Sequence, residues 1–119
     1  MEEPYFSTTN TTDPTTRLAF EMRKAEYEFW VNQVPELDSD FELVTQSLYR
    51  TTGVNEGRIG HILMALHRLE ELPKLQALQH RLYHLDLDRI IAINKSLNRL
   101  GNPTPKVVER IDEQLTAYL

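Results

Sequence analysis

Apolar side chains recur along this chain at intervals of three and four residues, the spacing that places them on one face of an α-helix. No segment alternates apolar and polar residues over the length of a strand, and no Asn-Gly or Asp-Gly pair marks a hairpin. The sequence therefore predicts an all-α fold, a compact bundle of about six helices. The predicted inward stripes are Leu18, Met22, Ala25 and Phe29 bordered by Trp30; Phe41, Val44 and Leu48; Ile59, Ile62, Leu63, Leu66 and Leu69; Leu75, Leu78, Leu82 and Leu85; Ile90, Ile93, Leu97 and Leu100; and Val108, Ile111 and Leu115.

Residues that start or stop helices separate these stripes. Proline suits the first turn of a helix, because its fixed φ is already helical and the N–H it lacks would have no partner there. Aspartate, serine and threonine cap helix starts, and glycine ends helices. The predicted boundaries are Pro14, Pro35, Asp38 or Ser39, Gly53, Pro73, Asp86 or Asp88, Gly101, and Thr104 with Pro105.

The two ends of the chain differ from its middle. Residues 1–13 are rich in Thr, Asn and Asp without helical periodicity, which favours a mobile tail before a single helical domain over residues 14–119. The chain stops at Leu119 inside an apolar helical stripe, without a glycine or a capping group. A helix ending at a natural terminus explains this, but we favour the N-terminal part of a longer protein.

The segment TQSLYRTTGVNEGRIGHILMAL, residues 45–66, resembles a helix-turn-helix. That motif needs a glycine turn between two helices and apolar residues that pack them at a steep angle. Tyr49 departs from the pattern, because its position usually takes a small residue where the helices approach closely. Gly57 and Gly60 each weaken the second helix by about 1 kcal/mol relative to alanine, unless they permit close approach of another segment. Corners of this kind also occur in bundles without a role on DNA.

Several polar residues are candidates for DNA contact. In the helix-turn-helix interpretation, Asn55, Arg58 and His61 lie on the exposed part of the second helix. There Arg58 would bond guanine edges and Asn55 would bond adenine. The candidates for phosphate contact are Arg58, Arg68, Lys95 and Arg99. The alternative for Lys95 and Arg99 is the solvated face of an amphipathic helix.

His80 and His84 stand four residues apart in HRLYHLDLD, which would place both rings on one helix face. Two such histidines can begin a zinc site, and Asp86 or Asp88 would add oxygen ligands. No third ligand is evident and no glutamate follows in the metalloprotease pattern. Two surface histidines explain the spacing better, so we predict no metal.

Aromatic residues of the first helix are candidates for contact with a protein partner. Tyr27 and Trp30 would anchor such a contact, in the way that large aromatic side chains do at interfaces. The alternative is that Phe29 and Trp30 belong to the core.

Charge divides the chain unevenly. Residues 1–49 carry 3 basic and 10 acidic residues, whereas residues 50–119 carry 10 basic and 8 acidic residues, so the net charge of −5 comes from the first half. A protein that binds DNA strongly by itself usually shows a distinctly basic face. The acidic half instead favours a basic partner or a basic part of a longer chain.

Composition excludes several classes of site. The chain has no cysteine, which rules out disulfides, thiolate metal sites and cysteine nucleophiles. It has no apolar run long enough for a membrane span and no signal peptide. No phosphate-binding glycine loop, serine elbow or HExxH pattern is present. We therefore expect a cytoplasmic, non-enzymatic protein without a cofactor or small-molecule substrate.

Three segments carry a resemblance to a known family: TGVNEGRIGHILMALHRLEELP, LQALQHRLYHLDLDRIIAINKSLNRL and VVERIDEQLTAYL. Residues 49–119 resemble the helical domain of unknown function 222 of actinobacterial 13E12-repeat proteins, with Leu72 and Pro73 as the Leu-Pro that ends its helix-turn-helix-like segment. Proteins of that family commonly carry an HNH nuclease module downstream. The resemblance implies a DNA-acting protein, but this chain has no HNH residues, so no nuclease role is carried over.

The leading hypothesis is a non-catalytic helical module of an HNH-type or mobile-element protein that supports binding or positioning of duplex DNA. The alternative is a module for protein interaction or dimerisation. A third is a phage or prophage regulator that binds a host protein, which the sequence does not separate from the second.

Overall fold

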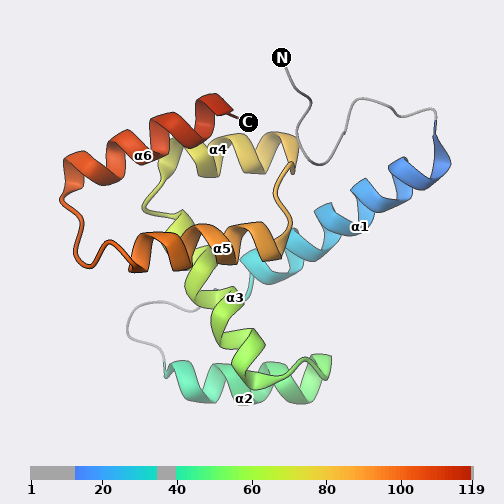
Figure 1. Ribbon diagram of the computed structural model, residues 1–119. Helices are drawn as coiled ribbons and strands as arrows, with labels where there is room; N and C mark the ends of the chain where they lie inside the picture. Colours follow the sequence, from blue (N-terminus) through green and yellow to red (C-terminus); the bar gives the residue numbers. More distant parts are fainter. Residues whose placement is uncertain (1–12, 35–39, 119) are drawn as a thin grey trace.

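The computed structural model describes residues 13–34 and 40–118, which form six helices and no strand (Figure 1). This confirms the predicted all-α bundle. The predicted mobile tail lies outside the described residues except for Asp13, and so do Pro35, Asp38, Ser39 and Leu119. The helices are α1 (Pro14–Val31), α2 (Phe41–Thr52), α3 (Glu56–Leu69), α4 (Pro73–Leu82), α5 (Leu87–Asn98) and α6 (Pro105–Tyr118).

Short polar side chains begin most of the helices. Asp13 caps α1 through the backbone N–H of Thr15, and Asp86 caps α5 through that of Arg89. The expected cap of α2, Asp38 or Ser39, is wrong: Asp40 accepts hydrogen bonds from the first turn instead. These side chains satisfy N–H groups that have no partner within the helix.

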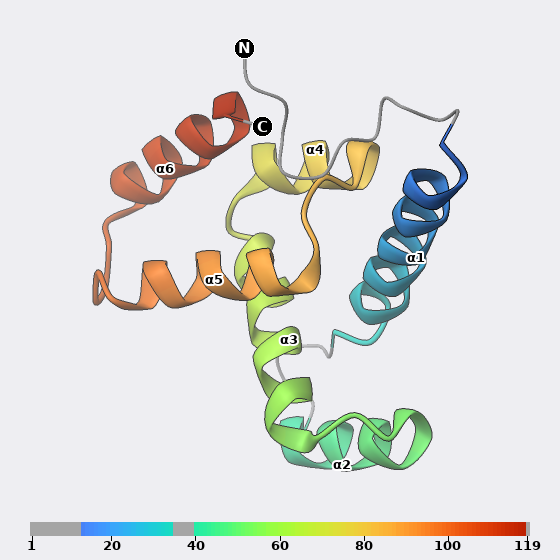
Figure 2. The same cartoon turned by 45° about the vertical axis from the view of Figure 1, so that its right-hand side comes forward.

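The core is built around α3, which crosses α5 and meets α2 at its own N-terminus (Figures 1 and 2). α4 and α6 pack together on the far side of α5 from α2. The predicted inward stripe of α3 is confirmed, because its five members are all at most 2 % exposed. They are Ile59, Ile62, Leu63, Leu66 and Leu69.

The predicted inward stripe of α1 is wrong. Leu18, Met22 and Phe29 are 63 %, 70 % and 40 % exposed, and Ala25 is exposed as well. The helix has a second set of large side chains on its opposite face, and that set includes the buried Tyr27 and Trp30. Periodicity alone does not choose between two such faces. The aromatic face packs because it finds ring partners, among them His80 and Tyr83.

The stripe predicted across α4 is interrupted because the helix ends at Leu82. Tyr83 takes the left-handed conformation at φ 53°, and the chain turns toward α5. The buried Gln79 holds this turn: its Nε2 donates to the carbonyl of Leu85 at 2.8 Å, and its Oε1 accepts the N–H of Leu85 at 2.9 Å. Leu85 is buried as expected, but in the loop.

The predicted face of α5 is partly wrong. Ile90 and Leu97 are buried as expected, but Leu100 lies beyond the helix and is 55 % exposed. The buried face includes Asn94, whose Oδ1 accepts a hydrogen bond from Nε of Arg68 on α3. The crossing of α3 and α5 therefore needs a polar residue at a position where periodicity expects an apolar one.

Candidate functional site

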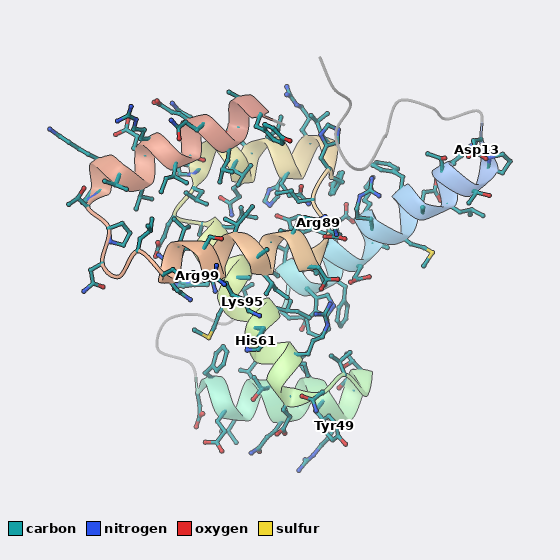
Figure 3. All side chains as sticks on the ribbon, viewed as in Figure 1. Asp13, Tyr49, His61, Arg89, Lys95 and Arg99 are labelled. Atoms are coloured by element: carbon teal, nitrogen blue, oxygen red, sulfur yellow. The ribbon has the colours of Figure 1, made fainter. Side chains whose placement is uncertain are left out.

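The corner between α2 and α3 has the elements of the predicted helix-turn-helix. Gly53 ends α2 in the left-handed conformation at φ 75°, where a side chain is strained. Leu48 and Ile59 are buried between the helices. Tyr49 is 49 % exposed and points away from the corner, so its size does not prevent close approach of α2 and α3 (Figure 3).

The two glycines of α3 have different surroundings. A Cβ added to Gly57 would lie 3.1 Å from Oδ1 of Asn55, so Gly57 leaves room for the side chain that caps α3. A Cβ on Gly60 would meet only Phe41, at an ordinary contact distance of 3.9 Å. The space beside Gly60 would hold a side chain, so this glycine is not required there by the close approach of another segment.

Hydrogen bonds within the fold occupy the side chains of Asn55 and Arg68. Oδ1 of Asn55 accepts the N–H of Gly57 at 2.8 Å, while recognition of adenine needs both the oxygen and the nitrogen of the amide. The Arg68 guanidinium donates to Asn94, to Glu71 at 2.9 Å and to Asn98 at 2.8 Å. Both residues therefore have structural roles that compete with DNA contact.

Arg58 bridges α3 and α5. Its Nη1 lies 3.0 Å from Oδ1 of Asp88, and the two side chains are 45 % and 66 % exposed. An exposed ion pair contributes about 0–1 kcal/mol. Arg58 is therefore held near the start of α5 but exchanges this partner for another anion at small cost.

Arg58, His61, Lys95 and Arg99 form what we call the basic strip. Asp88 and Lys95 are seven residues apart and share one face of α5. Arg99, the C-cap of α5 four residues after Lys95, keeps helical backbone angles and continues that face. Arg58 pairs with Asp88 at the start of the face. Figure 3 shows His61, Lys95 and Arg99 around the crossing of α3 and α5. All four side chains are exposed. Lys95 and Arg99 form no ion pair with the described residues.

His80 and His84 do not share a helix face. Because α4 ends at Leu82, His84 lies in the following loop, while the ring of His80 contacts that of Tyr27 with centroids 5.6 Å apart. Within the part of the chain that the structure describes, no group of three acidic, histidine or cysteine side chains is arranged to hold a metal ion. The prediction that this pair shares a helix face is therefore wrong.

Tyr27 and Trp30, the candidate partner anchors, are 2 % and 5 % exposed and belong to the core. The alternative that placed Trp30 in the core is confirmed, whereas Phe29 is 40 % exposed. The phenol of Tyr27 is raised in pKa by burial and, to a smaller extent, by the neighbouring Tyr83. Neither anchor is available for contact unless α1 is displaced.

An exposed apolar surface lies on α1 where the sequence pattern predicted a buried face. Leu18, Met22, Ala25 and Phe29, which we call the outer stripe, lie on the face opposite Tyr27 and are all exposed. The 4-3-4 spacing identified the stripe but not its direction. The presence of a second large-residue face on the same helix was the signal that could have revealed it.

A groove of about 310 Å³ borders the outer stripe. It lies between α1 and the segment that begins α5, with a cation of α3 on its wall. The lining residues are Ala19, Met22, Arg23, Glu26, Arg58, Asp86, Leu87 and Asp88. Met22 belongs to both the stripe and the groove, so the two form one continuous surface.

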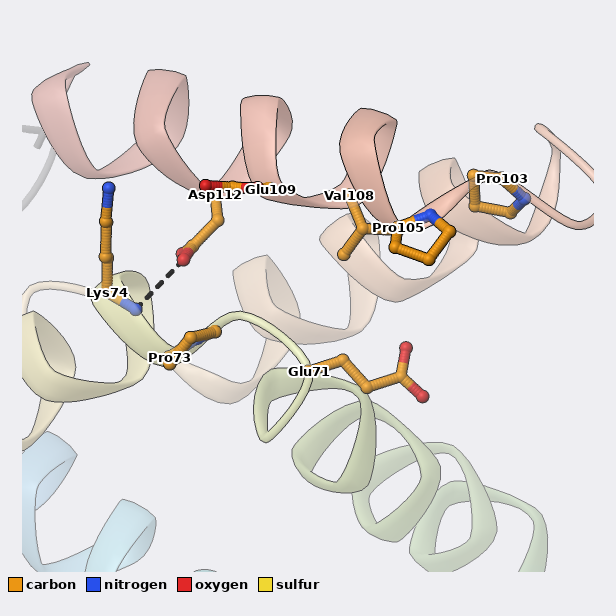
Figure 4. A pocket seen from close by; sticks show the side chains of 8 residues that line it. All are labelled: Glu71, Pro73, Lys74, Pro103, Pro105, Val108, Glu109 and Asp112. Carbon is orange, nitrogen blue, oxygen red and sulfur yellow. Dashed lines mark hydrogen bonds between the residues drawn. The ribbon is translucent and has the colours of Figure 1, made fainter.

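A second groove, of about 520 Å³, lies between the start of α4 and α6 (Figure 4). Its wall includes Asp112, which is 2 % exposed and was not a candidate in the sequence analysis. Oδ2 of Asp112 accepts the N–H of Lys74 at 3.0 Å, and Oδ1 accepts that of Leu75 at 2.8 Å. Leu72 at the N-cap position offers no acceptor. The carboxylate thus caps α4 from another helix, and this accounts for the buried charge.

None of the described helices is long and apolar enough to cross a bilayer.

Comparison with family models, curated proteins and solved structures gives no match to the chain. The resemblance to the helical domain of unknown function 222 therefore stays a prediction.

Proposed function

We propose that the chain is a non-catalytic helical module that supports the binding of duplex DNA in the cytoplasm, with the basic strip on the phosphate backbone. One arrangement carries this proposal. Lys95 and Arg99 lie on the same face at the C-terminal end of α5. Asp88, at the start of that face, holds Arg58 of α3 beside it through an ion pair of 3.0 Å. Phosphate contacts fix the position of a protein on DNA without reading its sequence. Such a role suits a module of a larger HNH-type or mobile-element protein, as the resemblance implies.

The strip is small, so its affinity is modest. Each phosphate contact adds about 0.9 to the slope of log affinity against log salt. Three fixed cations give a slope of about −2.7, which is about a 40-fold loss of affinity for a fourfold rise in salt. Arg68 and Asn55 are left out of this contact set because their polar groups hold α3 in place.

A titration of labelled duplex DNA by fluorescence anisotropy, at low and moderate salt, tests the proposal. We expect the double variant Lys95→Glu/Arg99→Glu to lose measurable binding. The matched control is Lys106→Glu/Arg110→Glu, which makes the same charge change at exposed positions of α6 with the same spacing. Absence of binding at low salt, or an equal loss in both variants, would show that the strip is not the DNA contact.

A further inference from the structure

The charges that border the outer stripe of α1 are acidic on both sides. With 100° between successive residues, Glu21 and Glu28 fall along one edge and Glu26 along the other, and all three are exposed. The cations of this helix lie farther from the stripe. Arg17 makes a long contact of 3.8 Å with Glu21, and Lys24 lies 5.3 Å from the ring centroid of Tyr83.

The groove beside the stripe extends this acidic border. Asp86 and Asp88 lie on its wall together with Glu26. Arg89 and Arg58 pair with those two aspartates at 3.0 Å each, whereas no ion pair with a described residue forms at Glu26. Arg23 lies on the same wall and interacts with the charge of Asp86. Glu26 is therefore the carboxylate of the groove that a basic side chain of a partner would meet, next to the apolar surface of Met22.

We propose that the outer stripe of α1 docks a helix of another protein whose apolar face is bordered by lysine or arginine. The stripe spans residues 18–29, roughly 16 Å or three turns. An amphipathic helix places residues at the same 4-3-4 spacing and lies along such a surface. Burial of Leu18, Met22 and Phe29 supplies the driving force, and the bordering glutamates select a basic partner.

A second copy of the chain does not satisfy this surface. If two α1 helices paired through their outer stripes, Glu21, Glu26 and Glu28 of one copy would face the same acidic residues of the other. Like charges placed together at a helix interface oppose association. The docking does not rest on DNA binding, because Leu18, Met22, Ala25 and Phe29 lie outside the basic strip, although Arg58 of the strip also lines the adjoining groove.

Two synthetic amphipathic helical peptides test the proposal against the full chain. Both carry leucine at 4-3-4 spacing, one with lysines and the other with glutamates at the bordering positions. By isothermal titration calorimetry, the lysine peptide should bind and the glutamate peptide should not. Leu18→Asp should weaken binding about tenfold or more. Leu43→Asp on α2 is the matched control, since Leu43 is 62 % exposed against 63 % for Leu18, and should leave binding unchanged.

Charge reversal separates this docking from general attraction between an acidic protein and a basic peptide. The variant Glu21→Lys/Glu26→Lys should bind the glutamate peptide in preference to the lysine peptide. The proposal fails if the lysine peptide does not bind the unaltered chain, if Leu18→Asp and Leu43→Asp behave alike, or if the preference does not reverse. It also fails if sedimentation shows a dimer that Leu18→Asp dissociates, because a second copy would then cover the stripe.

Discussion

The carboxylate of Asp112 accepts the backbone N–H of Leu75 at 2.8 Å, so that α6 caps the N-terminus of α4 across 37 residues of chain. The same carboxylate accepts the N–H of Lys74. Leu72, at the local cap position, has no side-chain acceptor. A helix that cannot cap itself is thus completed by one that is distant in sequence, and this contact joins α6 to the rest of the bundle.

Replacement of Asp112 tests this cap. Asp112→Ala leaves two N–H groups without their acceptor at a buried helix end, so we expect the free energy of unfolding to fall by about 2 kcal/mol. Urea denaturation followed by circular dichroism measures the change. Glu113→Ala is the control, because it removes only the exposed contact with Nζ of Lys74. Equal destabilisation by the two variants would contradict the capping role.

Tyr83 holds α1 against the bundle. Its hydroxyl donates to Glu28 at 2.9 Å, and its ring meets those of Phe20 and Tyr27 edge-on. We expect Tyr83→Ala to speed amide hydrogen exchange in α1 while α3 stays protected, because the variant removes two ring contacts and the hydrogen bond to Glu28 from α1 and leaves the buried stripe of α3 intact. Tyr49→Ala, at an exposed tyrosine of α2, should leave exchange in α1 unchanged. Unaltered α1 exchange in Tyr83→Ala would show that other contacts suffice.

The buried phenol of Tyr27 makes stability sensitive to alkaline pH. Burial raises its pKa above the usual 10.0, so the folded chain holds this proton more tightly than the unfolded chain. The free energy of unfolding therefore keeps its full value below pH 10.0 and falls as the pH rises above that value. Its hydroxyl has no hydrogen-bond partner among the described residues. Tyr27→Phe should therefore raise the free energy of unfolding by about 1 kcal/mol at neutral pH.

Thermal unfolding at neutral pH and above pH 10.0 measures both effects of Tyr27→Phe. The variant should lose much of the alkaline decline. A smaller decline remains, because the pKa of Tyr83 is also raised, chiefly by its hydrogen bond to Glu28. A variant that is less stable at neutral pH and keeps the full decline would refute this account.

His84 makes stability sensitive to acid. Burial lowers its pKa below the usual 6.5, and the nearby charge of Arg23 lowers it further. The folded chain therefore binds this proton less readily than the unfolded chain. The free energy of unfolding therefore has its full value above pH 6.5 and decreases as the pH falls through the lowered folded-state pKa of His84.

Melting temperatures between neutral pH and pH 5 should show this decline in the unaltered chain and a weaker one in His84→Asn. The exposed His61 provides the control, since His61→Asn should keep the decline of the parent. If both substitutions leave the same slope, the acid sensitivity belongs to other groups.

Helix boundaries were largely predictable because their signals act within one turn of the chain. Pro73 and Pro105 begin helices as expected, Asp86 caps α5, and Gly53 ends α2. The wrong boundary at the start of α2 followed from three neighbouring residues that are all good caps, of which Asp40 makes the hydrogen bonds. Local chemistry therefore determines where most helices begin and end, whereas the end of α4 at Leu82, before the predicted Leu85, and its cap by Asp112 depend on tertiary contacts.

The candidate site was less predictable because its residues depend on distant partners. Arg68 reaches Asn94 and Asn98, 26 and 30 residues away, and so becomes part of the packing between α3 and α5. Arg58 finds Asp88 across the same crossing. Arg58 and Arg68 find partners on α5 because α3 crosses that helix. Lys95 and Arg99 stay exposed. The sequence alone does not distinguish these two pairs of cations.

The sequence by itself determined that the chain is helical, where most helices begin and end, and that α1 carries an apolar stripe at 4-3-4 spacing. Only the tertiary structure decided that this stripe faces outward. The physical reason is that both faces of α1 satisfy helical periodicity, and the buried face is the one whose rings meet His80 and Tyr83. These contacts leave the stripe that was predicted for the core on the surface, where Leu18 and Met22 are mostly exposed. There it forms the surface that we propose docks a partner.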